Sequence, residues 1–240
     1  MRRRQHMWKA FSFLSCCVQC NEFKLYAPDA MSVPKGLCVA IPCYFKYPES
    51  HRNFSGPLYG YWYEKGRNPN RDPALATNDG NKPLVPDARV RFYLSDKLEE
   101  GNCSLFVTDV QQSDQKDYFF RMQKGHGYNY FPSTSVRVTE TPKPEIQILG
   151  KLQAGQPVSL TCTVASCPWK SPQISWEFTR RISGTLSSLS DGTKLSNVVP
   201  NFVPLAADNG QFLTCKVTYG SGSASLVISE KRIHLNVSCE

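Results

Sequence analysis

The chain has 240 residues, ten cysteines, 17 prolines and a formal net charge of +8. This length allows one large domain or two of ordinary size, and so many cysteines argue against an ordinary cytosolic enzyme, because disulfides form in oxidising compartments. The charge would suit nucleic acid, an acidic membrane surface or an acidic glycan. No basic run is dense enough to favour one of these, so solvated surface charge is the ordinary explanation and no nucleic-acid partner is predicted.

Residues 1–20 resemble a secretory signal peptide. Three arginines at positions 2–4 precede a short apolar stretch at positions 8–18, which predicts cleavage near Cys20. The alternative is that the CCVQC segment binds a metal, is redox-active or is acylated. No histidine or second cysteine pair stands at zinc spacing, so no metal site and no cofactor are predicted.

No later stretch reaches the roughly 18 apolar residues of a membrane helix. Direct membrane insertion of this chain is therefore not predicted. The chain is expected to be extracellular, either as part of a longer cell-surface receptor or as a secreted form.

The rest of the chain predicts an all-β protein of two tandem immunoglobulin-like sandwiches. Short apolar runs alternate with turn residues in both halves, and no convincing amphipathic helix is present. The joint lies in TETPKPEIQI, where Pro142 and Pro144 separate two strand patterns. The predicted domains span 21–141, of variable (V-set) type, and 142–239, of C2-set type, after the signal peptide at 1–20.

Six strands are expected in the first domain, at residues 37–45, 58–66, 89–96, 102–110, 116–123 and 133–140. Trp62 is the expected core aromatic residue. Asp114 and Tyr118 have the spacing of a tyrosine corner, two residues before the position where a variable-type domain carries a half-cystine. This chain has Phe120 there, so its disulfide must lie elsewhere.

Strand parity predicts where that disulfide lies. Cys103 shares the inward parity of strand 102–110, and this strand neighbours strand 37–45 in one sheet of the fold, so Cys103 is expected beside Cys43. Such a bridge should stabilise the domain by roughly 3 to 4 kcal/mol, with Phe120 filling the space between the sheets. Arg91 and Asp114 are expected to form a buried, purely structural ion pair.

The second domain shows the cysteine, tryptophan, cysteine order of an ordinary immunoglobulin domain. Its expected strands include residues 158–164, 173–178 and 208–217, and its disulfide is expected between Cys162 and Cys215 across core Trp176. Cys38 and Cys167 are left over and are predicted to form an interdomain bridge. The alternative is that each is free or bonds another chain. Cys239 has no predicted partner.

Three Asn-x-Ser sequons predict N-glycosylation and agree with a secreted or cell-surface protein; they are Asn53, Asn102 and Asn236.

These segments together resemble the sialic-acid-binding immunoglobulin-like lectins, the Siglecs. The resemblance rests on LCVAIPCYFKYP, GYWYEKG, ATN, NCSLFVTD and DYFFRM, followed by LTCTV, ASC, ISW and LTC, and it covers about residues 22–238. It implies a lectin, not an enzyme, whose first domain binds sialylated glycans of glycoproteins or glycolipids in cell adhesion and immune recognition. It also implies possible ligands in cis, on the same cell.

The resemblance also implies the site residues. Arg121 falls on the arginine that pairs with the sialic acid carboxylate, and a planar, permanently charged guanidinium suits that role. If its neighbour along the strand faces the core, strand parity turns Arg121 outward from the sheet. Phe23 and Tyr128 fall on two aromatic positions that contact the glycan, so that two aromatic residues would frame the arginine. Asn129 falls on a position that hydrogen-bonds the ligand, and Tyr130 is the alternative aromatic residue.

The loop at residues 65–73 carries Arg67 and Arg71, which would suit an additional acidic group, although solvated loop charge is the commoner explanation.

The alternative function is an adhesion or receptor module of the same fold that binds a protein partner independently of sialic acid. An enzyme is disfavoured, because no histidine stands in a nucleophile motif.

Overall fold

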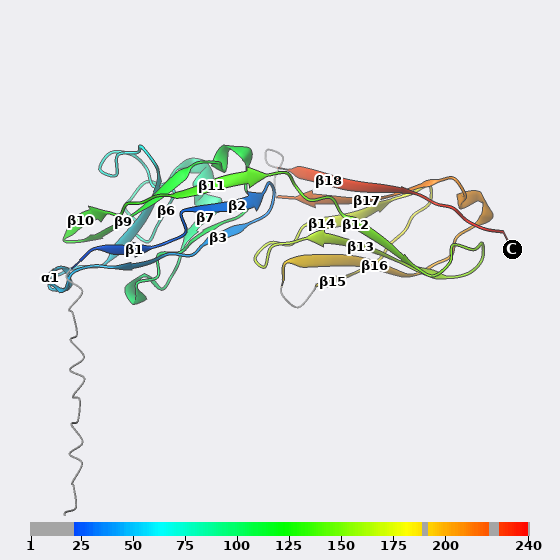
Figure 1. Cartoon of the computed structure of the whole chain (residues 1–240), viewed down its shortest axis with the longest axis horizontal. Helices are drawn as coiled ribbons and strands as arrows, with labels where there is room; N and C mark the ends of the chain where they lie inside the picture. Colours follow the sequence, from blue (N-terminus) through cyan, green and yellow to red (C-terminus); the bar gives the residue numbers. More distant parts are fainter. Residues whose placement is uncertain (1–21, 189–191, 221–225, 240) are drawn as a thin grey trace, which may run out of the picture.

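The computed structural model describes residues 22–188, 192–220 and 226–239. The predicted signal peptide, with its CCVQC segment, lies outside these residues. Two β-sandwiches follow one another along the long axis of the molecule (Figure 1). None of the helices in the described ranges is long and apolar enough to cross a membrane.

The first sandwich contains a large sheet in the order β2-β11-β9-β5-β6, in which β10 also pairs with β9, and a second sheet in the order β3-β8-β7. A short ladder of β1 and β4 completes it. The strands are β1 (Lys24–Tyr26), β2 (Ala30–Pro34), β3 (Val39–Ile41), β4 (Tyr44–Lys46), β5 (Tyr59–Glu64), β6 (Ala76–Thr77), β7 (Phe92–Leu94), β8 (Leu105–Val107), β9 (Asp117–Lys124), β10 (His126–Asn129) and β11 (Thr134–Thr139).

The second sandwich packs a four-stranded sheet, β12-β13-β16-β15, against a three-stranded sheet, β14-β17-β18. Its strands are β12 (Glu145–Leu149), β13 (Val158–Ala165), β14 (Gln173–Glu177), β15 (Thr185–Ser188), β16 (Lys194–Phe202), β17 (Phe212–Tyr219) and β18 (Val227–His234). The all-β fold and the V-set character of the first domain thus agree with the sequence prediction.

Several strands are shorter than the sequence predicts. The expected strand 37–45 is split into β3 and β4 around Pro42, which has no N–H to donate to a ladder. The expected strand 89–96 begins inside the 3-10 helix η1 (Pro86–Val90), which has proline in its first turn. The expected strand 208–217 likewise begins at the end of η4 (Ala206–Asp208), and strand 102–110 is reduced to β8.

Helical turns occupy some of the connections. One four-residue helix, α1 (Glu49–Arg52), follows Pro48 and buries no residue. Two more 3-10 turns, η2 (Leu98–Glu100) and η3 (Gln112–Asp114), flank β8. None is long enough to form a layer of the fold, which matches the absence of an amphipathic pattern.

The core of the first domain shows what replaces the usual disulfide. Cys43 is bonded to Cys103 within the β3 and β8 side of the sandwich, and both are fully buried. Phe120 is also fully buried, with ring centroids 5.1 Å from Phe45 and 5.7 Å from Trp62. The Trp62 indole N–H donates to the Cys103 carbonyl at 2.8 Å. An aromatic cluster therefore fills the space between the sheets.

The second domain has the ordinary arrangement, with Cys162 bonded to Cys215 between its sheets. Trp176 is half-buried against this core, and its indole N–H donates to Asn197 at 2.7 Å. Among the described cysteines, Cys239 is exposed and not disulfide-bonded.

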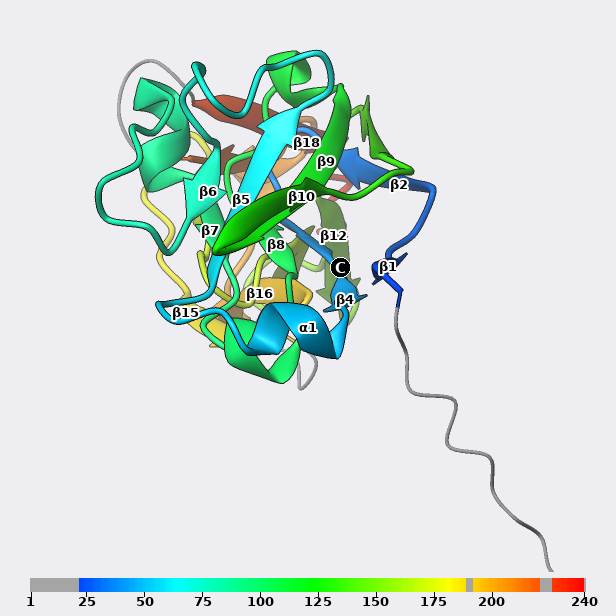
Figure 2. The same cartoon turned by 90° about the vertical axis from the view of Figure 1, so that its left-hand side faces the viewer.

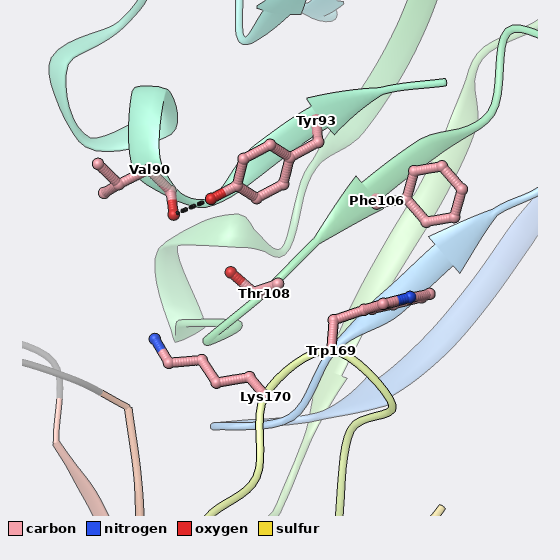
Figure 3. Close-up of a pocket in the computed structure, with 6 residues that line it drawn as sticks. All are labelled: Val90, Tyr93, Phe106, Thr108, Trp169 and Lys170. Atoms are coloured by element: carbon pink, nitrogen blue, oxygen red, sulfur yellow. Dashed lines mark hydrogen bonds between the residues drawn. The ribbon is translucent and has the colours of Figure 1, made fainter. Parts of the chain in front are cut away.

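The two domains meet in a covalently fixed joint. Cys38 is bonded to Cys167, and Leu37 packs into the core of the second domain. The Lys170 ammonium contacts the Asp109 carboxylate across the joint. Lys170 also lines a cavity of about 370 Å³ at the joint (Figure 3). The walls of this cavity come from both domains and consist of Val90, Tyr93, Phe106, Thr108, Trp169 and Lys170.

Candidate functional site

Arg121 lies on the outer face of the large sheet of the first domain. Its neighbours along β9, Phe120 and Met122, are fully buried, so strand alternation turns Arg121 outward, where it is half-buried. It lies opposite Tyr61 of β5 and Asn129 of β10 in the ladder. The β10 end of the β9 and β10 hairpin lies, together with α1, at the end of the domain farthest from the second domain (Figures 1 and 2).

The Arg121 guanidinium is held by amide oxygens. Its Nη1 donates to Oδ1 of Asn129 at 2.9 Å, and its Nη2 lies 3.5 Å from Oδ1 of Asn70 in the loop between β5 and β6. Among the residues that the structure describes, no carboxylate forms an ion pair with Arg121. The positive charge is therefore positioned but not neutralised by a contact, as an anion-binding site requires.

Buried tyrosines beside Arg121 support this face. Tyr61 and Tyr63 share its side of the sheet, and both are buried in a cluster with Phe119. The Tyr61 hydroxyl donates to the Asp79 carboxylate at 2.9 Å. Neither tyrosine was predicted to belong to the site, although the alternation around inward-facing Trp62 in YGYWYE places both on the same face as Arg121.

The tyrosine hydroxyls stay neutral at physiological pH. Burial raises the pKa of Tyr63 to about 12, against the opposing effect of the nearby Arg121 charge. Burial, followed by the hydrogen bond to Asp79, raises the pKa of Tyr61 as well. The site thus offers a cation on an aromatic, uncharged support.

The four predicted ligand residues form two pairs. Arg121 and Asn129 come together, as described. Phe23 and Tyr128 stack on one another, with centroids 3.7 Å apart and an interplanar angle of 9°. Tyr128 lies opposite buried Met122 in the ladder, so its side chain leaves the strand on the opposite side from Arg121. The expected frame of two aromatic residues around the arginine is therefore not seen.

The hairpin register explains this difference. Between the expected strands 116–123 and 133–140 lies a further strand, β10, which begins directly after Gly125 at a φ of 67°. The position of this turn determines to which face of the sheet each side chain of β10 points. The alternative aromatic residue, Tyr130, is buried in the core, and its hydroxyl donates to the Lys46 carbonyl at 2.8 Å.

The residues to which the sequence assigned a structural role, Arg91, Asp114 and Tyr118, form contacts inside the first domain. Arg91 and Asp114 form a bidentate pair at 2.6 and 3.0 Å, with side chains only 13% and 9% exposed. The Tyr118 hydroxyl donates to the Asp114 carbonyl at 2.6 Å, as a tyrosine corner requires. In the loop at 65–73, Arg67 pairs with Glu64 at 3.6 Å and Arg71 is exposed.

The three sequons differ in accessibility. Asn53 and Asn236 are exposed, whereas Asn102 is half-buried and pairs with Tyr44 in an isolated β-bridge.

The cavity of Figure 3 is lined by none of the four predicted ligand residues. In the described parts of the chain, no group of three histidine, cysteine or carboxylate side chains is placed to hold a metal ion.

Comparisons with known proteins identify the family. Residues 26–140 match the family model of the immunoglobulin V-set domain. Sialic acid-binding Ig-like lectin 13 of Pan troglodytes is 39% identical over 90% of this chain and 55% of its own length. Sialic acid-binding Ig-like lectin 9 of Homo sapiens is 38% identical over 88% of this chain and 45% of its own.

The chain belongs to the Siglec family. Myeloid cell surface antigen CD33 of Mus musculus is also similar, at 37% identity over 96% of this Siglec and 57% of the mouse protein. The Siglec chain thus spans about half the length of the curated relatives it matches. Membership of a family of lectins agrees with the prediction that it is not an enzyme.

Proposed function

We propose that this Siglec binds terminal sialic acids of cell-surface glycoproteins and glycolipids through its first domain, with Arg121 pairing the sialic acid carboxylate. The proposal rests on the position of the Arg121 guanidinium. This group faces outward, takes its orientation from a hydrogen bond to the Asn129 oxygen, and has no acidic partner among the described residues. A planar guanidinium offers a carboxylate two parallel hydrogen bonds. The names of the relatives, which describe sialic acid binding, support the same ligand.

The remaining site residues have separate roles in this proposal. Asn129 orients Arg121 through its oxygen, and its amide N–H groups donate to ligand hydroxyls. Phe23 and Tyr128 contact the ligand as one stacked unit beside the hairpin, since Tyr128 keeps 38% of its surface exposed. The protein acts at the cell surface as part of a longer receptor, or as a secreted form, in adhesion and immune recognition. Ligands in cis, on the same cell, compete for the site.

A single site of this kind binds weakly. A charge-assisted hydrogen bond contributes about 1.5 to 3 kcal/mol, and packing of one sugar against aromatic residues adds about 1 to 2 kcal/mol. Strong adhesion therefore needs many copies of the site.

The test compares clustered full-length chains on sialylated cells. Arg121→Ala is expected to abolish binding with the fold intact, and Arg121→Lys to lose most of it, because lysine cannot form the bidentate pair. Arg137→Ala is the matched control, since Arg137 is an exposed strand arginine of the same domain. Sialidase treatment of the cells should remove binding by the unmodified chain.

Two results would contradict the lectin function. One is binding by Arg121→Ala equal to that of the unmodified chain. The other is binding that survives sialidase, which would favour a module that recognises a protein partner.

A further inference from the structure

Gly127 leaves open the space that the Arg121 guanidinium occupies. Gly127 lies opposite Gln123 in the ladder, on the same side of the sheet as Arg121 and Asn129. A Cβ atom on Gly127 would lie 2.0 Å from Nη2 of Arg121, 2.5 Å from Cζ and 3.0 Å from Nε. The guanidinium therefore lies across the bare backbone of β10.

The backbone itself does not require glycine at this position. Gly127 is absent from the residues with positive φ, whereas Gly125, two residues earlier, has a φ of 67°, which favours glycine. Alanine would fit the backbone at 127. The feature that only glycine supplies there is the absence of a side chain beneath Arg121.

We propose that Gly127 is a positioning residue, which sets the place and direction of the Arg121 guanidinium for carboxylate binding. The bare backbone covers one side of the guanidinium, and the Asn129 oxygen fixes Nη1 at 2.9 Å. A ligand carboxylate then approaches only from the side that faces away from β10. This inference rests on the proposed function, because it explains how the same arginine is presented.

The test is Gly127→Ala in the full, clustered chain. The three heavy atoms nearest to the new methyl group all belong to the end of the flexible Arg121 side chain, so the fold should persist while the guanidinium moves. We expect binding to sialylated cells to fall at least about tenfold, as expected for a lost charge-assisted hydrogen bond. Gly80→Ala is the matched control, because a Cβ at Gly80 meets nothing within 4 Å and its φ is not positive.

A second readout does not depend on glycan binding. The Nε–H signal of Arg121 in nitrogen-15 NMR spectra, assigned by its loss in Arg121→Ala, should shift in Gly127→Ala and stay in place in Gly80→Ala. An unshifted signal in Gly127→Ala would overturn the proposal. So would full binding by Gly127→Ala when Arg121→Ala has lost binding. Full binding by Arg121→Ala would instead overturn the proposed function, and the NMR result would still decide the role of Gly127.

The double variant Arg121→Ala with Gly127→Ala shows whether any loss of stability in Gly127→Ala comes from a clash with the Arg121 side chain. If Gly127→Ala lowers the midpoint of thermal unfolding, removal of the Arg121 side chain should restore it to that of Arg121→Ala alone, because the clash has gone. A double variant as unstable as Gly127→Ala would show that the glycine serves another contact and would contradict the proposal.

Discussion

Arg121 keeps its charge available because its two hydrogen-bond contacts, Asn129 and Asn70, are amide oxygens. Asn129 and Asn70 position the guanidinium at 2.9 and 3.5 Å without supplying a negative charge. A carboxylate in either position would form an internal ion pair that competes with an acidic ligand. The neutrality of these asparagines is thus as important as their oxygens.

Asn129→Asp tests this point with an almost unchanged shape. The new carboxylate would pair with Arg121, so we expect binding to sialylated cells to fall at least about tenfold while the free energy of unfolding changes by no more than about 1 kcal/mol. Cell binding and urea unfolding of the same preparation measure the two effects. Asn201→Asp is the control, since Asn201 is exposed and lies in β16 of the second domain. Unchanged binding by Asn129→Asp would show that a carboxylate at position 129 does not compete with the ligand for Arg121.

Strands that bury alternate residues were the most predictable elements. Side chains alternate between the two faces of a strand. This alternation predicted that Cys103 and Phe120 face the core, with Phe120 in the usual place of a half-cystine, and that Arg121 faces outward. It did not predict the register of the β9 and β10 hairpin, because one residue more or less in the turn moves every side chain of β10 to the other face. That is why Arg121 was placed correctly from sequence, whereas Tyr128 was expected beside it and instead stacks on Phe23.

The Arg91 and Asp114 pair ties β7 to the turn before β9, and it should matter for stability alone. Arg91→Met leaves the Asp114 carboxylate nearly buried without its cation, so we expect the free energy of unfolding to fall by about 2 to 4 kcal/mol. Lys116→Met, which breaks an exposed pair with Glu64, should cost no more than about 1 kcal/mol. Urea unfolding measures both. Glycan binding by folded Arg91→Met should equal that of the unmodified chain; a selective loss of binding would assign the pair a role in the site.

Three contacts join the two sandwiches. The Cys38–Cys167 bridge, the Lys170 and Asp109 contact and the edge-to-face packing of Phe106 on Trp169 at 5.2 Å hold the same region. The sequence indicated the cysteine pair by elimination. It did not indicate the aromatic cavity, because Phe106 and Trp169 come from different domains and meet only after the joint has formed.

Removing the bridge should loosen this joint. Small-angle X-ray scattering of Cys38→Ser with Cys167→Ser should show a broader distribution of interatomic distances than the unmodified chain, because the remaining contacts are noncovalent. Circular dichroism is the control that both sandwiches remain folded. Superimposable scattering curves would show that the noncovalent contacts alone fix the domains.

Stability should also depend on alkaline pH. Burial raises the pKa of Tyr63 and of Tyr219 to about 12 in the folded protein, against about 10 in an unfolded chain. Between these values the unfolded state releases protons that the folded state keeps, so stability is complete below about pH 10 and falls as the pH rises toward 12. Urea midpoints at several pH values above 9, with tyrosinate absorbance, measure this effect. A constant midpoint would contradict the burial of these hydroxyls.

One NMR titration tests whether Arg121 binds a carboxylate. The full chain is titrated with sialyllactose and with its methyl ester, which has the same shape but no negative charge. If Arg121 pairs with the carboxylate, the free acid shifts the signals of β9 and β10 and binds at least about tenfold more tightly than the ester. Equal affinity for the acid and the ester would show that Arg121 does not pair with the carboxylate.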